Sequence, residues 1–248
     1  MSATTSGTGL SVQRDGDVLQ LTLDREESGN RLSRPLLEAL AAQLEAVSGA
    51  DAPKVVVLAG AGPDFSLGRE PAPGPATPSG LRREFGLIQR VNELVVGCPA
   101  VTVAVIRGRA LGAGLSLAAR CDLVVAADDA RLAFPEVPHG IPPTIVLSHY
   151  RYVLLRRHLL DLILTGREIT AEEGQRMGLV SRVCPPAEVD AAVKDLVQRL
   201  GGYDVRTVRV VKQFVRRLDD VGPREAPTVG IEAYVNEMVD RAMAGGTR

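Results

Sequence analysis

The pattern of apolar and polar positions predicts strands in four places along the first half of the chain. Residues 18–24 (VLQLTLD) alternate between apolar and polar side chains, as a half-buried strand does. The runs 54–59 (KVVVLA), 101–106 (VTVAVI) and 123–127 (LVVAA) are short and almost wholly apolar. Runs of this kind are typical of strands that are buried on both faces of a sheet.

Helices are predicted between and after these strands. Apolar residues recur at helical spacing over 36–47, 81–95 and 189–200. Ser33 can cap the first of these helices, and Thr170 with Glu173 has the spacing of a capping box. From about residue 145 onward we expect helices alone.

Strands alternating with helices, followed by helices only, predict a layered α/β core with a helical C-terminal region. We place the core at residues 9–188 and the helical region at residues 189–248. Residues 1–8 are small and polar, and residues 71–80 contain four prolines, so both stretches are predicted to be loops or disordered.

Composition narrows the range of functions. The chain has 248 residues, with 29 basic and 30 acidic side chains, and only 3% of its residues are aromatic. Near-zero net charge and few rings disfavour a nucleic-acid partner. No segment approaches the roughly 20 apolar residues of a membrane helix, and the N-terminus does not resemble a secretory signal. With three cysteines that lack the spacing of metal ligands, we expect buried thiols in the cytoplasm and no metal site.

Three segments that each follow a strand could carry chemistry. In the first, residues 107–122 (RGRALGAGLSLAARCD), glycines occur where a strand gives way to a helix. Their spacing excludes the G-x-G-x-x-G dinucleotide fingerprint, and no G-K-[ST] follows. These glycines serve either close packing of strand and helix or the approach of a ligand to backbone N–H groups.

The other two segments contribute a second loop and a carboxylate. Residues 62–70 (GPDFSLGRE) also leave a buried strand, and two such loops could direct N–H groups at one oxygen, as an oxyanion hole requires. In residues 132–143 (LAFPEVPHGIPP), prolines make the backbone on both sides of Glu136 rigid. Glu136 is therefore either a solvated loop residue or a positioned acid or base.

Taken together, these segments resemble the crotonase (enoyl-CoA hydratase/isomerase) superfamily over about residues 10–215. The likeness is carried by residues 30–33 (NRLS), 65–70 (FSLGRE), 107–114 (RGRALGAG) with 121–122 (CD), 134–136 (FPE), 165–174 (TGREITAEEG) and 178–180 (GLV).

The resemblance implies a spiral of ββα units with C-terminal helices that assemble a homotrimer or hexamer. It implies an acyl-CoA thioester as the substrate, with no bound cofactor, and two backbone N–H groups that stabilise its enolate. Carried over by position, these donors belong to Arg69 and Ala113, with Gly68 and Gly112 beside them in the substrate pocket.

Two departures from the family pattern affect the reaction. Hydratases of the family carry two glutamates, and these positions hold Ser116 and Glu136 here. Because a hydroxyl cannot replace a carboxylate base, the resemblance favours double-bond isomerisation with Glu136 as the single base. The family's terminal Ala-Phe and Lys-Arg-x-Pro segment has no counterpart, so the substrate could also be a carrier-protein thioester or a free diketone.

Two alternatives to the isomerase stay open at this point. His139, three residues after Glu136, is a candidate second acid–base group and would favour a lyase, hydrolase or decarboxylase acting on C–C bonds. The third hypothesis is a non-catalytic scaffold that keeps the trimer.

Overall fold

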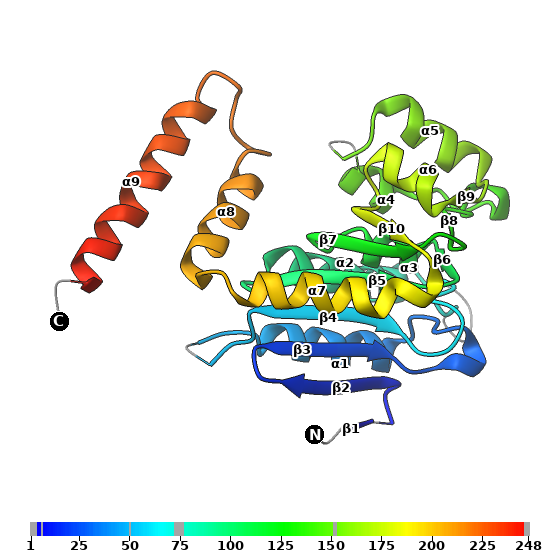
Figure 1. Cartoon of the computed structure of the whole chain (residues 1–248). Helices are drawn as coiled ribbons and strands as arrows, with labels where there is room; N and C mark the ends of the chain where they lie inside the picture. Colours follow the sequence, from blue (N-terminus) through cyan, green and yellow to red (C-terminus); the bar gives the residue numbers. More distant parts are fainter. Residues whose placement is uncertain (1–3, 6, 50, 72–76, 151–152, 246–248) are drawn as a thin grey trace. The chain divides into compact units, whose positions relative to one another are not determined.

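The computed structural model describes residues 4–5, 7–49, 51–71, 77–150 and 153–245, and it forms two compact units (Figure 1). The first unit is Met1–Gly201 and the second is Gly202–Arg248. The second unit consists of α8 (Val205–Arg217) and α9 (Ala226–Gly245), which contact each other.

The main sheet of the first unit has seven strands in the order β1-β2-β3-β4-β5-β7-β10. β1 pairs with β2 and β2 with β3 in antiparallel fashion, whereas β3, β4, β5, β7 and β10 run parallel to one another. The strands are β1 Thr4–Thr5, β2 Leu10–Asp15, β3 Val18–Leu23, β4 Val55–Gly60, β5 Val101–Ile106, β7 Leu123–Ala127 and β10 Arg182–Cys184.

A second, three-stranded sheet carries the segments singled out for chemistry. It consists of β6 (Arg109–Leu111), β8 (Arg131–Ala133) and β9 (Ile169–Thr170), in the order β6-β8-β9. The expectation of helices alone after residue 145 was therefore wrong, because β9 and β10 both follow that point. Strands of two and three residues are too short to show an alternating pattern.

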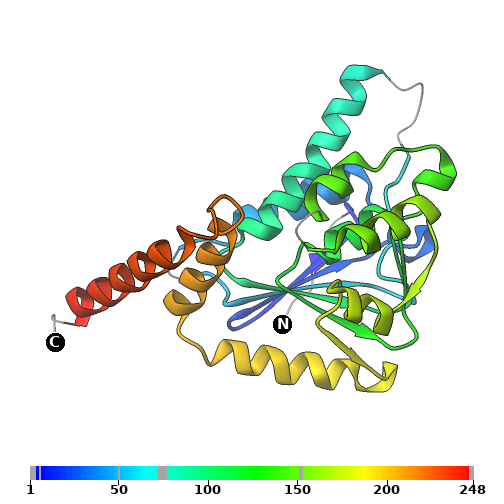
Figure 2. The same ribbon diagram turned by 90° about the horizontal axis from the view of Figure 1, so that it is seen from above.

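Helices cover both faces of the main sheet (Figures 1 and 2), with α7 on one face and α1 and α2 on the other. The helices of this unit are α1 Arg34–Glu45, α2 Pro78–Gly97, α3 Ala113–Ala118, α4 Thr144–Tyr150, α5 Arg156–Thr165, α6 Ala171–Met177 and α7 Val189–Gly201. The predicted caps are present, since Ser33 Oγ accepts a hydrogen bond from the N–H of Leu36 and Thr170 Oγ1 from that of Glu173.

α7 packs on the main sheet and is part of the first compact unit, whereas the sequence analysis placed its residues in the C-terminal helical region. Val189 and Leu196 are buried, and the helix packs against β4, β5 and β7. The compact unit consequently extends to Gly201, past the boundary expected after residue 188.

Parts of the two stretches that were predicted to be loops are ordered. Thr4–Thr5 pairs with β2, and α2 begins at Pro78, with the side chain of Thr77 as its N-cap. Proline is tolerated in the first turn of a helix because the N–H there has no intrahelical partner. Residues 72–76 lie outside the described part of the chain.

Leu, Val, Ile and Ala build the core, as the low aromatic content requires. Phe134 and Tyr150 are both buried, and their ring centroids are 5.6 Å apart. Of the three thiols, Cys98 is buried, whereas Cys121 and Cys184 are half-buried and so differ from the expectation. In the part of the chain that the structure describes, no helix has the length and hydropathy to span a bilayer.

Candidate active site

The loop that contains Gly68 and Arg69 lies alongside the segment that leads into α3. The N–H of Phe65 donates to the carbonyl of Arg107 (3.0 Å), and the N–H of Leu111 donates to the carbonyl of Ser66 (2.9 Å). A Cβ atom built on Gly68, whose φ is +95°, would lie 3.1 Å from the carbonyl oxygen of Leu111 and 3.9 Å from the nitrogen of Ala113. The tertiary structure thus brings the two glycine-containing loops into direct contact.

The N–H groups of Arg69 and Ala113 are not used in backbone pairing. The residues on either side of Arg69 bond to Leu32, through Leu32 N–H to Gly68 O (2.9 Å) and Glu70 N–H to Leu32 O (3.1 Å). Ala113 is the first residue of α3, where N–H groups have no intrahelical acceptor. Across the described ranges, neither amide donates to another backbone carbonyl.

The side chain of Arg69 lies against α2. Its Nη1 is 3.4 Å from Glu84 Oε2, and its guanidinium carbon is 5.3 Å from the centre of the Phe85 ring. The side chain of Arg69 is therefore held by its own contacts with α2.

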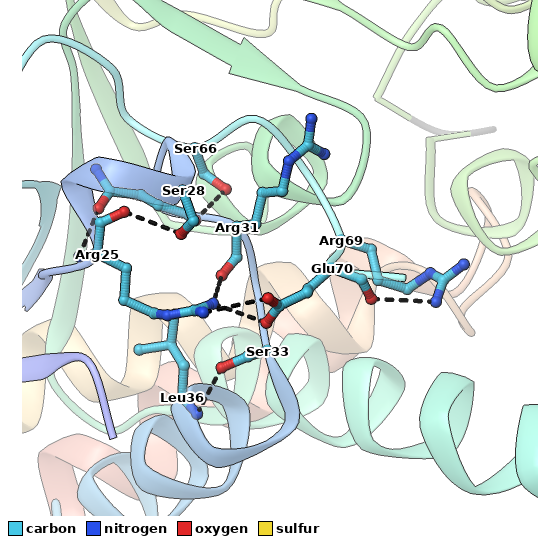
Figure 3. A network of polar contacts seen from close by, with 9 residues as sticks. Arg25, Ser28, Arg31, Ser33, Leu36, Ser66, Arg69 and Glu70 are labelled. Atoms are coloured by element: carbon cyan, nitrogen blue, oxygen red, sulfur yellow. Dashed lines mark hydrogen bonds and ion pairs between the residues drawn. The ribbon is translucent and has the colours of Figure 1, made fainter. Parts of the chain in front are cut away.

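A partly buried polar network holds the other side of the same loop (Figure 3). Arg25 forms a two-pronged ion pair with Glu70, at 2.8 and 3.2 Å, and also donates to the carbonyl of Arg31 (2.8 Å). Ser66 Oγ donates to the carbonyl of Asn30 (2.8 Å). The ion pair with Arg25 lowers the pKa of Glu70, so this carboxylate is charged and serves as an anchor for the loop.

Asn30 is a structural residue whose role was not predicted. It is 1% exposed and has a φ of +53°, a region that asparagine enters more readily than most residues. Its side-chain amide donates to the carbonyls of Ala61 and Asp64 (both 2.8 Å), and its Oδ1 accepts from the N–H of Arg25 (2.9 Å). The G-N pair at residues 29–30 was the available signal, because it marks a turn.

Asp64 and Arg109 tie the two loops together, and this ion pair was also not predicted. Asp64 Oδ1 accepts from both the N–H (2.8 Å) and the Nε (3.0 Å) of Arg109, and Oδ2 is 2.7 Å from Nη2. The hydrogen bonds from Arg109 lower the pKa of Asp64. Because the residues are 45 positions apart, no local pattern could have paired them.

Glu136 lies beside Gly112, immediately after the small sheet. A Cβ built on Gly112, whose φ is +52°, would be 2.9 Å from Glu136 Oε1. Glu136 Oε2 is buried and has no hydrogen-bond partner in the described structure. Burial disfavours the charged form and raises the pKa of this carboxyl group, an effect that the nearby His139 partly opposes.

Ser116 is 3% exposed, and its Oγ also has no partner among the residues described. Its N–H donates to the carbonyl of Gly112 (2.9 Å), which places Ser116 one helical turn after Gly112. The hydroxyl of Tyr150 donates to the carbonyl of Ser116 (2.9 Å) and so holds this turn in place.

His139 is exposed and turns back on its own loop. Its Nδ1 is 2.6 Å from the carbonyl oxygen of Pro135, and its N–H donates to the carbonyl of Glu136 (3.0 Å). The structure therefore brings together the segments of Gly68, Arg69, Gly112, Ala113, Ser116 and Glu136, whereas the ring of His139 caps a loop.

Most of the chain is similar to known proteins. The enoyl-CoA hydratase/isomerase family model matches residues 13–229. The 2,3-dehydroadipyl-CoA hydratase of Escherichia coli (strain K12) is 30% identical to this chain over 219 aligned residues, which cover 86% of this chain and 83% of that protein.

Two crystal structures extend the similarity to the fold. An enoyl-CoA hydratase of Mycobacterium smegmatis superposes with a TM-score of 0.88 at 26% identity, covering 94% of this chain and 91% of that one. A Thermobifida fusca YX protein solved in complex with CoA has a TM-score of 0.82 at 28% identity, covering 98% and 99%. These matches confirm the expected α/β crotonase-type fold. The chain belongs to the crotonase (enoyl-CoA hydratase/isomerase) family and is a hydratase/isomerase-like enzyme.

Proposed function

We propose that this enzyme moves a double bond within an acyl-CoA thioester, with Glu136 as its single base. The N–H groups of Arg69 and Ala113 would bind the thioester oxygen. The observation that carries the proposal is the position of the Glu136 carboxylate, which is buried, has an unpartnered Oε2 and lies beside Gly112, next to the Ala113 amide.

The reaction needs one group that both removes and returns a proton. Glu136 would take a proton from the carbon next to the thioester carbonyl of a 3-enoyl substrate, and electron density would move onto the carbonyl oxygen. The two amides would stabilise that charge, because preorganised donors bind a developing oxyanion better than the neutral carbonyl. The protonated Glu136 would then return the proton to the fourth carbon, which leaves the double bond between the second and third carbons. A carboxyl group whose pKa is raised by burial is suited to both steps.

Hydration would require a second group to hold and activate a water molecule. The matching position holds Ser116, whose hydroxyl cannot act as a carboxylate base. His139, which favoured the lyase, hydrolase or decarboxylase alternative, is exposed and bonded through its Nδ1 to Pro135, so no observation favours that alternative over isomerisation. A CoA thioester is the preferred carrier because a relative has been solved with CoA.

The oligomeric state of the enzyme and its cellular compartment are part of the same proposal. An exposed apolar surface on α9 supports self-association as a homotrimer or hexamer. Its exposed apolar side chains are Ile231, Tyr234, Val235, Met238, Val239 and Met243. The three cysteines of the sequence are odd in number and too few for a disulfide framework, which supports a reducing compartment, the cytoplasm.

The test follows isomerisation of a 3-enoyl-CoA and hydration of the matching 2-enoyl-CoA. Glu136→Gln preserves the shape and removes the base, so it should lower isomerase kcat by roughly 100-fold or more. Ser116→Ala should cost far less, and Glu172→Gln, at an exposed helical position, is the matched control. Equal isomerisation by wild type and Glu136→Gln would contradict the proposal and favour the scaffold. Hydration of the 2-enoyl-CoA at a higher rate than isomerisation would assign the enzyme to the hydratases.

A further inference from the structure

Two polar side chains follow the proposed active site, Ser116 within α3 and Arg120 just after its end. Gly112, Ser116 and Arg120 are spaced four residues apart, which places them close to one face of a helix. The backbone continues to turn in the helical sense after α3 ends at Ala118, since the N–H of Arg120 donates a hydrogen bond to the carbonyl of Leu117 (3.3 Å). Arg120 acts electrostatically on Tyr150, whose hydroxyl is bonded to Ser116, so the two side chains share one neighbourhood.

Several polar atoms in this neighbourhood are buried without a partner in the described structure. They are Ser116 Oγ, Arg120 Nε and His149 Nδ1, together with Asn92 Nδ2 on the buried face of α2, which packs against α3. Arg120 takes part in none of the ion pairs formed within the described ranges. Leaving a buried polar atom unpaired is unfavourable, so a hydrogen-bond partner for these atoms is expected.

The charge of this neighbourhood favours an anion. Burial and the proximity of Arg120 lower the pKa of His149, so its ring is neutral near pH 7, while Arg120 keeps its positive charge. Glu93 is the acidic group that acts on His149 from α2, but it is exposed and accepts a hydrogen bond from Gln89 Nε2 (2.7 Å).

The distance along α3 indicates which part of the substrate could reach Arg120. At about 1.5 Å per residue, Arg120 lies about 10 Å beyond Ala113 along the helix axis, and helical side chains point back toward the N-terminus. A thioester oxygen bound by the Ala113 amide would therefore leave the far end of a short acyl chain near Ser116 and Arg120.

We infer that this enzyme selects acyl thioesters that carry a carboxylate at the far end of the acyl chain, bound by the Ser116 hydroxyl and the Arg120 guanidinium. The inference rests on the proposed function, because it uses the thioester position given by the Arg69 and Ala113 amides. It assigns Ser116, where hydratases of the family carry a glutamate, a role in recognition instead of catalysis.

The experiment measures the Kd of matched CoA thioesters by isothermal titration calorimetry on the full chain. The pairs are adipoyl-CoA with hexanoyl-CoA and glutaryl-CoA with pentanoyl-CoA, which differ only in the terminal carboxylate. The wild type should bind the carboxylated member of at least one pair roughly 10- to 100-fold more tightly, as charge-assisted hydrogen bonds imply. Arg120→Met should abolish this preference, Arg120→Lys should restore part of it, and the exposed Arg182→Met should retain it in full.

The outcomes separate the inference from the proposed function. Tight binding of both members without preference would overturn the inference, leave the proposed function intact and assign the unpartnered atoms to ordered water. Failure of every CoA thioester to bind would overturn the proposed function and the inference with it. Because Kd is compared within each pair on the same variant, a general loss of stability cannot imitate a lost preference.

Discussion

Gly112 offers the sharpest test of the site geometry, because one added methyl group would meet the proposed base. The Cβ of Gly112→Ala would lie 2.9 Å from Glu136 Oε1 and 3.9 Å from the Cδ of Pro135. A contact of this length requires the carboxylate to move, since proline on either side limits any shift of its backbone. A misplacement of about 1 Å at a reacting group can lower the rate about 100-fold. We therefore expect kcat/KM of Gly112→Ala to fall by about two orders of magnitude.

The same substitution also forces alanine into an unfavourable backbone conformation. Gly112 has φ +52° and ψ −121°, which L-residues rarely adopt, and such strain costs about 1–3 kcal/mol of unfolding free energy. Gly16→Ala is the control, because Gly16 has a similar φ of +55°, lies between β2 and β3 and has no atom near its Cβ position.

The assay combines steady-state isomerisation of a 3-enoyl-CoA with urea denaturation of both variants. Gly16→Ala should lose stability and keep its kcat/KM, whereas Gly112→Ala should lose both. If Gly112→Ala folds and retains wild-type kcat/KM, the carboxylate of Glu136 does not have to stay where the structure places it. The assignment of this group as the base would then be refuted.

Three further predictions concern the base, the loop scaffold and the assembly. Burial raises the pKa of Glu136 in the folded state, so the native state binds a proton more tightly than the unfolded state does. The contribution of Glu136 to stability therefore declines as the pH rises from the pKa of the unfolded state through that of the folded state. Glu136→Gln should raise Tm at pH 7.5 and have little effect at pH 4, and equal shifts in Tm at both pH values would contradict the assignment. Asn30→Ala leaves two carbonyls and one N–H without their bonds, and urea denaturation should show a loss of about 3 kcal/mol or more, against little change for the exposed Gln20→Ala. Mass photometry should report trimers or hexamers, Tyr234→Asp on α9 should shift the population to monomers, and a stable wild-type monomer at micromolar concentration would exclude the assembly.

The sequence determined those parts of the protein whose physical cause is local. The apolar runs 101–106 and 123–127 form β5 and β7 with the same bounds, and the helical pattern over 189–200 forms α7, which ends at Gly201. Ser33 caps α1 because its hydroxyl needs only a backbone N–H three residues away. The family likeness rested on short motifs whose order and separations could be read along the chain.

The tertiary structure alone decided what depends on residues distant in sequence. The ion pair of Asp64 with Arg109 and the anchoring of Glu70 by Arg25 each join positions 45 residues apart, and both orient the loop that contains Arg69. Burial of Glu136 next to Gly112, and with it the raised pKa, arises only when β8 packs beside β6. The burial of Arg120 Nε without a partner likewise depends on elements that pack around the end of α3, a property of the described tertiary structure. Local sequence patterns specify backbone conformation, but desolvation and pairing depend on what the rest of the chain places around a side chain.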